Sequence, residues 1–377
     1  MKKFLLTIIC CFTAFSFIGN TAFAQPVLPI QEMYVKGQVN EVKEERLQIH
    51  ADNPLYDPQK EDPQYQRIQQ VTYELLEGEY KGIIFQSENE IMQRIFDLDL
   101  KKGSKVLVLL QIYEDGAISG FATDYIRNNT MIIFIALFVI ALLLIGKLKG
   151  LRALLSLAIT IGAIFYILIP MTAKGYDPLI IAVLISIGVT IVTITLIAGF
   201  NRKGVSAIIG TLGGVFFAAL IAYIVGKVSM LTGLSGEDAR ILYVNKPGLN
   251  FYHIFFASII IGALGAIMDV GMSIASSVHE IAEASSNKKR DELFKAGMNV
   301  GKDIMGTMSN TLILAYVGSA LPLLILFSMN DFGTMQVINF DFIAAEIVRS
   351  ISGSFGLLLA IPITAFAGAF LVSKKSH

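Results

Sequence analysis

Cysteine is nearly absent from this chain, which carries only Cys10 and Cys11 among its 377 residues. Both lie in residues 1–24, a segment that we expect to be removed. The mature chain would then have no cysteine, which excludes disulfide bonds, thiolate catalysis and zinc sites with cysteine ligands. The Thr-Ile-Ile sequence before Cys10 does not form a lipobox, so we expect no lipid anchor.

Residues 1–24 have the pattern of a secretory signal peptide. Two lysines follow Met1, an apolar run covers residues 4–18, and an Ala-Phe-Ala sequence at 22–24 offers small residues for cleavage before Gln25. An uncleaved first transmembrane helix is the alternative. The short apolar run and the helix-breaking Gly19-Asn20 favour cleavage.

Histidine and charged residues are also scarce. The chain has four histidines, and charged residues make up 16% of it, against about a quarter in soluble proteins. The formal net charge is zero, which gives no support to nucleic-acid binding. His279-Glu280 begins a zincin-like sequence, but Glu283 stands where the second histidine is needed. We therefore expect no metal, no cofactor and no enzyme, with an intramembrane enzyme as a third alternative.

Long apolar runs, in contrast, are abundant in the chain. Seven of them come near the ~20 residues that cross the hydrocarbon core of a bilayer, although the first is short. Residues 128–377 are therefore predicted to form an all-α transmembrane helix bundle of about seven spans. The runs cover residues 130–145, 153–171, 179–200, 205–225, 254–274, 308–327 and 350–372.

Residues 25–127 form the one soluble-looking segment, and we expect a small antiparallel β domain there. Alternating apolar and polar residues predict strands at 34–39, 69–76 and 105–113. Asp115-Gly116 between two apolar runs predicts a hairpin with a further strand at 117–121. The segment has no catalytic cluster, and its single histidine, His50, is expected to be a surface residue.

Basic residues gather in every second connection between the predicted spans. The positive-inside rule places these connections in the cytoplasm, including a loop at 275–307. The β domain is then extracytoplasmic, where a cleaved signal would also send it, and the C-terminus lies inside. The basic set comprises Lys147, Lys149, Arg152, Arg202, Lys203, Lys288, Lys289, Arg290, Lys295, Lys302, Lys374 and Lys375.

Five polar residues fall where membrane sequence should be most apolar. Asp269 lies late in the fifth predicted span, with Ser273 one turn later. Asp303, Thr307 and Asn310 are spaced i, i+4 and i+7 and lead into the sixth span. A charge at the bilayer centre costs at least ~2.5–3.5 kcal/mol on insertion scales unless it is satisfied. We expect the two stripes to face each other across an aqueous vestibule that takes a small polar solute or cation. The alternative is that both aspartates simply lie in water at the interface.

Glu346 and Arg349 stand three residues apart before the last span, on one face if that segment is helical. An outer gate or ligand contact is one interpretation, and an interfacial ion pair is the other.

Glycines at 210, 213 and 214, at 262 and 265, and at 353 and 356 indicate close helix packing, with hinges as the alternative. Pro170, Pro322 and Pro362 predict kinks.

Several segments carry a family pattern, the longest and most specific being Gly301–Ser319. In these segments, which begin at Leu76, the chain resembles the YibE/F family of bacterial multi-pass membrane proteins. The resemblance implies several spans and an outward N-terminal domain, and it implies no activity. The segments are 76–82, 199–203, 262–269, 301–319 and 345–349.

Two functions of different classes remain open. The first is a transporter or permease that uses the polar stripes. The second is a membrane scaffold, assembly or signalling protein whose outer domain binds envelope partners. Polar groups deep between helices would favour the first, and a dry bundle with its aspartates at the surface would favour the second. Either protein would have the lipid bilayer as its surroundings, with homo- or hetero-oligomers possible.

Overall fold

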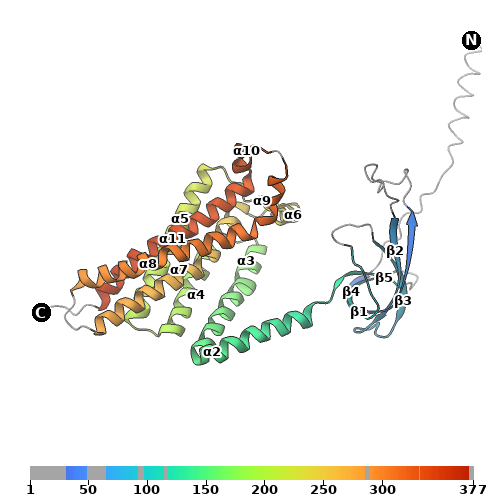
Figure 1. Cartoon of the computed structure of the whole chain (residues 1–377), viewed down its shortest axis with the longest axis horizontal. Coiled ribbons are helices and arrows are strands. Elements are labelled where there is room, and N and C mark those ends of the chain that lie inside the picture. Colours follow the sequence, from blue (N-terminus) through green and yellow to red (C-terminus); the bar gives the residue numbers. More distant parts are fainter. Residues whose placement is uncertain are drawn as a thin grey trace, which may run out of the picture. The chain divides into compact units, whose positions relative to one another are not determined.

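The computed structural model of the chain describes residues 31–48, 65–91, 97–113, 118–284, 289–330 and 332–372. The predicted signal peptide, both cysteines, His50 and Asp115-Gly116 lie outside these residues. The chain forms two compact units, Met1–Leu137 and Phe138–His377. Figure 1 labels the strands of the first unit and the helices of the second.

The first unit contains a five-stranded antiparallel sheet in the order β3-β2-β1-β4-β5. The sheet curls, because the edge strands β3 and β5 come into contact. A carbon built on Gly120 of β5 would lie 3.1 Å from the Phe85 ring of β3. The strands are β1 (Gln31–Gln48), β2 (Tyr65–Leu75), β3 (Ile84–Ile91), β4 (Lys105–Ile112) and β5 (Ile118–Tyr125).

Alternate residues of the sheet build its core, as a two-residue period requires. Val106, Val108 and Leu110 of β4 are fully buried beside Val71 and Tyr73 of β2. The predicted strands correspond to β1, β2 and β4, and the predicted hairpin is present as the β4–β5 pair. Sequence reasoning missed β3, whose residues are half-buried or exposed up to its last position.

The rest of the described chain is helical. Five helical segments are long and apolar enough to cross a membrane, or six when the bent pair α8 and α9 counts as one span. The helices are α2 (Asn128–Ala163), the π-helical η2 (Ile164–Leu168), α3 (Ile169–Ala173), α4 (Pro178–Ala198), α5 (Arg202–Val228), α6 (Glu237–Asn245), α7 (Phe251–Ala284), α8 (Arg290–Ser319), α9 (Leu321–Ser328), α10 (Thr334–Asn339) and α11 (Asp341–Val372).

The helices differ from the seven predicted apolar runs in two respects. The first two runs lie in one helical stretch of 46 residues, 128–173, which has a non-helical residue at Lys147 (φ 47°, ψ −127°). The sixth run is broken, because α8 ends at Ser319 and α9 continues after a bend of 61°. Pro322 lies in the first turn of α9, where proline is tolerated, whereas a helix interior would not accept it.

The predicted cytoplasmic connection at 275–307 is mostly helical in the structure. Helix α7 continues to Ala284, and α8 begins at Arg290. Val278 near the end of α7, and Leu293 and Gly297 at the start of α8, are buried at helical spacing. The segment reads as polar because only one face of each helix packs against the bundle.

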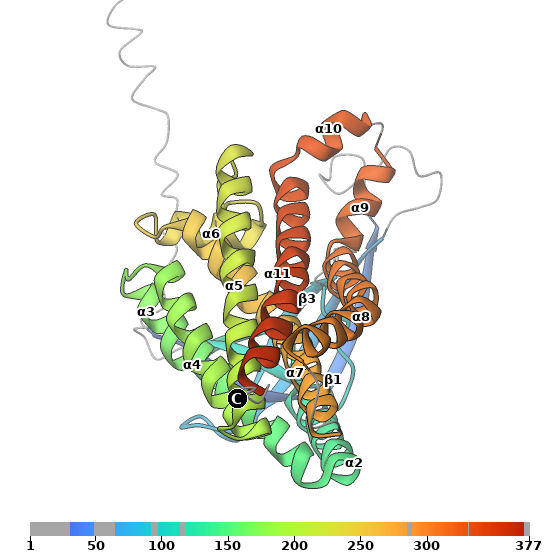
Figure 2. The ribbon, with the colours of Figure 1, turned by 90° about the vertical axis from the view of Figure 1, so that its left-hand side faces the viewer.

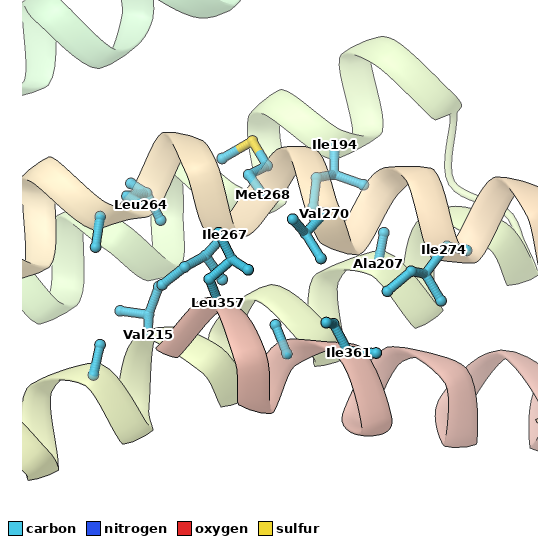
Figure 3. Packing of buried hydrophobic residues seen from close by; sticks show 14 of the residues in the cluster. Ile194, Ala207, Val215, Leu264, Ile267, Met268, Val270, Ile274, Leu357 and Ile361 are labelled. Carbon is cyan, nitrogen blue, oxygen red and sulfur yellow. The ribbon is translucent and has the colours of Figure 1, made fainter. Parts of the chain in front are cut away.

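The core of the helical unit lies where α4, α5, α7, α8 and α11 meet. Figure 2 shows α11 between α5 and α8, and Figure 3 shows Val215 of α5, Ile267 of α7 and Leu357 of α11 packed together. A Cβ on Gly214 would lie 2.7 Å from the carbonyl oxygen of Gly356. These glycines therefore serve close packing of α5 against α11.

Candidate functional site

Asp269 and Ser273 lie on a face of α7 that the rest of the chain leaves uncovered. Both side chains are exposed, whereas Ile267, Val270 and Ile274 between and beside them are buried in the core. Figure 3 shows those three side chains in the cluster formed with α4, α5 and α11. The helical period therefore separates α7 into one packed apolar face and one open polar face.

Asp303, Thr307 and Asn310 lie on the corresponding open face of α8. All three are exposed, and the helix packs through Leu293, Gly297, Gly301 and Leu312. Gly301 contacts Ile361 of α11 and lies close to Ile274 of α7. At about 100° per residue, Asp303 and Asn310 are about 200° and 180° around the helix from Gly301. The stripe thus points away from the bundle.

These side chains find few partners in the chain. Thr307 donates its hydroxyl to the Ile304 carbonyl at 2.9 Å, which is a contact within the helix. Among the described residues, the side chains of Asp269, Asp303 and Asn310 make no hydrogen bond or ion pair. Arg152 does not pair with Asp269 and lines a separate cavity of about 650 Å³ beside α4. The single chain leaves both stripes open, and the shared vestibule stays a prediction.

Glu346 and Arg349 form an ion pair on the first turns of α11. The Nη2 atom of Arg349 lies 3.5 Å from Oε1 of Glu346, and the two side chains are 26% and 28% exposed. The guanidinium also sits over the Phe255 ring, 5.4 Å from its centroid. Cation–π contact of this kind holds an arginine against an aromatic face. The position of Arg349 is thus fixed from two sides.

A cavity of about 340 Å³ opens at this ion pair, and sequence reasoning missed it. It lies at the break between α8 and α9, beside the start of α11. Stacking of Phe327 on Phe342, with centroids 5.2 Å apart, joins α9 to α11. The Ala-Leu-Pro sequence at 320–322 was the signal that could have indicated the break. The cavity is lined by Ser235, Gly236, Ser319, Ala320, Pro322, Leu323, Phe342, Glu346 and Arg349.

A second pair that sequence reasoning missed joins α4 to α7. Oδ2 of Asp177 lies 2.6 Å from Nδ1 of His253. Oδ1 of the same carboxylate accepts hydrogen bonds from the backbone of Leu179 and Ile180 and caps α4. Partial burial raises the pKa of Asp177, but the hydrogen bonds from His253 and the backbone together bring it below its usual range. Only a fold could bring together residues 76 positions apart.

In the described part of the chain, no group of three or more histidine, cysteine, aspartate or glutamate side chains could hold a metal ion. The candidate site residues offer carboxylates, hydroxyls, an amide and one guanidinium. These groups can bind and orient polar solutes or exchange protons.

One comparison with known proteins identifies the family of the chain. A family model described as YibE/F-like protein matches residues 134–374. The match begins within α2 and covers the later helices, so it includes every candidate site residue and leaves out the β sheet. No curated protein and no solved structure was found to match the chain.

Proposed function

The chain belongs to the YibE/F-like protein family, and on that premise we propose that it is a permease-like membrane protein. The polar faces of α7 and α8 would border a water-filled passage for protons, cations or small polar solutes. One observation carries the proposal. Asp269 lies on an open face of α7, which is apolar enough to cross a membrane, and Asp303 lies on an open face of α8, which is so together with α9. The described residues give neither carboxylate a hydrogen bond or an ion pair.

The hydrocarbon chains of lipids cannot hydrogen-bond to these carboxylates or solvate their charge. A charge facing hydrocarbon costs several kcal/mol, so intramembrane carboxylates face protein or water. Because the two stripes are open on the single chain, a second chain must complete the passage. We therefore propose a homo-oligomer in which the stripes of neighbouring chains enclose water, and in which Asp269 and Asp303 exchange protons or hold a cation.

Seven crossings fit this proposal best. A helical stretch of 46 residues would be about 69 Å long, which exceeds a ~30 Å hydrocarbon core more than twofold. Division at Lys147 gives two crossings, and the bent α8–α9 pair gives one more. With residues 1–24 removed as a signal, the β domain lies outside a bacterial cell membrane and the C-terminus lies inside, in agreement with the basic loops.

Vesicle experiments test the passage directly. Purified protein would be reconstituted into liposomes with an entrapped pH dye, and proton entry would be followed after an imposed potassium diffusion potential. We expect entry above that of protein-free liposomes, and at least a tenfold loss with Asp269→Asn or Asp303→Asn. Asp238→Asn on α6, which lies outside the stripes, serves as the matched control. Equal proton entry with and without protein would refute proton passage.

A membrane scaffold is the second candidate, because the exposed faces that carry Asp269 and Asp303 are also suited to contact with another protein. In that case the polar faces of α7 and α8 would be covered by another protein without enclosed water. The two functions differ in a measurable way, because a passage leaves these faces wet and a packed interface leaves them dry.

A further inference from the structure

The cavity at the α8–α9 break combines features that a small-molecule site needs. Its volume of about 340 Å³ lies within the range of ligand pockets. Three separate segments enclose it: the loop before α6, the junction of α8 with α9, and the first turns of α11. Stacking of Phe327 on both Phe340 and Phe342 holds the α9 and α11 walls together. The cavity is therefore formed before a ligand arrives.

Both charged groups in this cavity are incompletely paired. The single contact between Arg349 and Glu346, at 3.5 Å, is longer than the ~2.7–2.9 Å of a good charge-assisted hydrogen bond. Oε2 of Glu346 and Nε of Arg349 are buried, and neither has a hydrogen-bond partner among the described residues. Both side chains line the cavity and are about a quarter exposed, so a ligand that supplies both a donor and an acceptor at their accessible atoms would add the contacts that this long ion pair lacks.

We propose that this cavity binds a small zwitterion, with its ammonium group at Glu346 and its carboxylate at Arg349. A simple anion would be repelled by Glu346, and a simple cation by Arg349, whereas a dipolar ligand matches both charges. The carboxyl end of α8, at Ser319 and Ala320, also lines the cavity.

This site is separate from the polar faces of α7 and α8. None of Asp269, Ser273, Asp303, Thr307 and Asn310 lines the cavity. Binding of a zwitterion here does not require that anything crosses the membrane through those faces, so either proposal can fail without the other.

A single cysteine placed in the cavity gives a direct test. In the full chain with Cys10 and Cys11 changed to serine, Ser319→Cys reports on the cavity, and Ser235→Cys gives a second reporter on another wall. The rate of modification by methyl methanethiosulfonate would be measured in detergent, alone and with a pool of glycine, alanine, serine and proline. Acetate and methylammonium serve as probes with one charge each. Ser229→Cys, which does not line this cavity, is the matched control.

We expect the zwitterion pool to slow modification severalfold at both reporters and not at Ser229→Cys. Glu346→Gln and Arg349→Gln should each raise the half-protecting concentration about 10- to 100-fold, since each removes a charge-assisted contact. Lys227→Gln, near the same end of the bundle, should have no effect. The charge-preserving Glu346→Asp and Arg349→Lys should retain part of the protection, which separates loss of the ligand contact from loss of the fold.

Three results would overturn the assignment. The first is an absence of protection by the pool at both reporters. The second is protection by acetate or methylammonium as strong as that by the pool, which would indicate a site for a single charge. The third is protection that persists in both charge-neutralised variants, which would place the ligand away from the ion pair.

Discussion

The carboxylate of Asp177 makes two kinds of contact at once. One oxygen accepts the backbone hydrogen bonds that cap α4, and the other pairs with His253 on α7. Contacts of this kind restrain a helix end that would otherwise leave amide groups unsatisfied. The pair therefore fixes the start of α4 against α7 at one end of the bundle.

Acid should weaken this junction through Asp177. Because the pKa of Asp177 is lowered in the folded chain, its contribution to stability is present above the unfolded pKa of 3.8 and is lost as pH falls through the lower folded value. We expect Asp177→Asn, which can still cap α4, to lose this pH dependence. Asp177→Ala should in addition lose about 0.5–2 kcal/mol from the missing cap. Thermal unfolding in detergent, measured from neutral pH down to ~pH 3, checks the predictions for both variants. If the stability of the wild type and of Asp177→Asn changed with pH in parallel, the role given to the Asp177 carboxylate would be contradicted.

Glycine decides how closely the long helices approach. A Cβ on Gly214 would lie 2.7 Å from both the Gly356 carbonyl oxygen and Cγ2 of Ile267, and 2.8 Å from Cβ of Ala360. Two of these neighbours are backbone or a short side chain and cannot rotate away. Helix α5 therefore depends on the absence of a side chain where it crosses α7 and α11.

Alanine at position 214 should destabilise the bundle by about 1–3 kcal/mol, because α5 would have to move away from α11. Gly188 on α4 offers a matched control, since a carbon added there would have no atom within 4 Å. Gly188→Ala should leave stability unchanged or raise it slightly through helix propensity. Denaturation of the two variants in the same detergent makes the comparison, and an equal loss in both would refute the packing argument.

Element lengths and types could be read from the sequence where one property dominates. The run at 205–225 lies within α5 and the run at 179–200 overlaps α4, which ends two residues earlier at Ala198, because both runs are largely apolar. The amino-terminal half of α8 looked like a loop because Leu293, Gly297 and Gly301 supply only a narrow packing face. The break at Ala320 depends on how α9 packs on α11 through Phe327 and Phe342, which no local pattern shows.

The whole molecule combines parts suited to different surroundings. The sheet has its own core of Val39, Val71 and Val106, and the helical unit has long faces of exposed leucine, isoleucine and phenylalanine. Exposed apolar surface on this scale is suited to lipid. From the placement of basic residues along the chain, we propose that the sheet lies outside the membrane.

Protease added to intact spheroplasts should cleave the β unit and spare the connection between α7 and α8. The signal-like residues 1–24 and the basic connections both motivate this expectation. Fragments would be identified with tags at either end of residues 25–377, and lysed spheroplasts serve as the control for protease access. Cleavage of the α7–α8 connection in intact spheroplasts, with the β unit protected, would reverse the orientation.

Candidate site residues could be placed on helices from their spacing, but not against one another. Asp303, Thr307 and Asn310 do share one face of α8, as the period of the helix requires. Which side of α8 packs on α11 depends on the fit of Gly301 to Ile361, and this fit turns the polar stripe outward. The Glu346–Arg349 pair was visible in the sequence, whereas the cavity beside it required the bend after Ser319.

Water at the polar faces of α7 and α8 is the central claim, and cysteine reactivity in the membrane measures it most directly. Ser273→Cys and Thr307→Cys, each in a chain without other cysteines, would be treated with a charged methanethiosulfonate reagent in inside-out vesicles. Leu184→Cys and Phe216→Cys, at exposed apolar positions of α4 and α5, are the lipid-facing controls. Because only a thiolate in water reacts with such a reagent, we predict rapid modification at 273 and 307 and almost none at 184 and 216. Polar positions as unreactive as the lipid-facing controls would contradict the passage and leave the scaffold as the function that the structure supports.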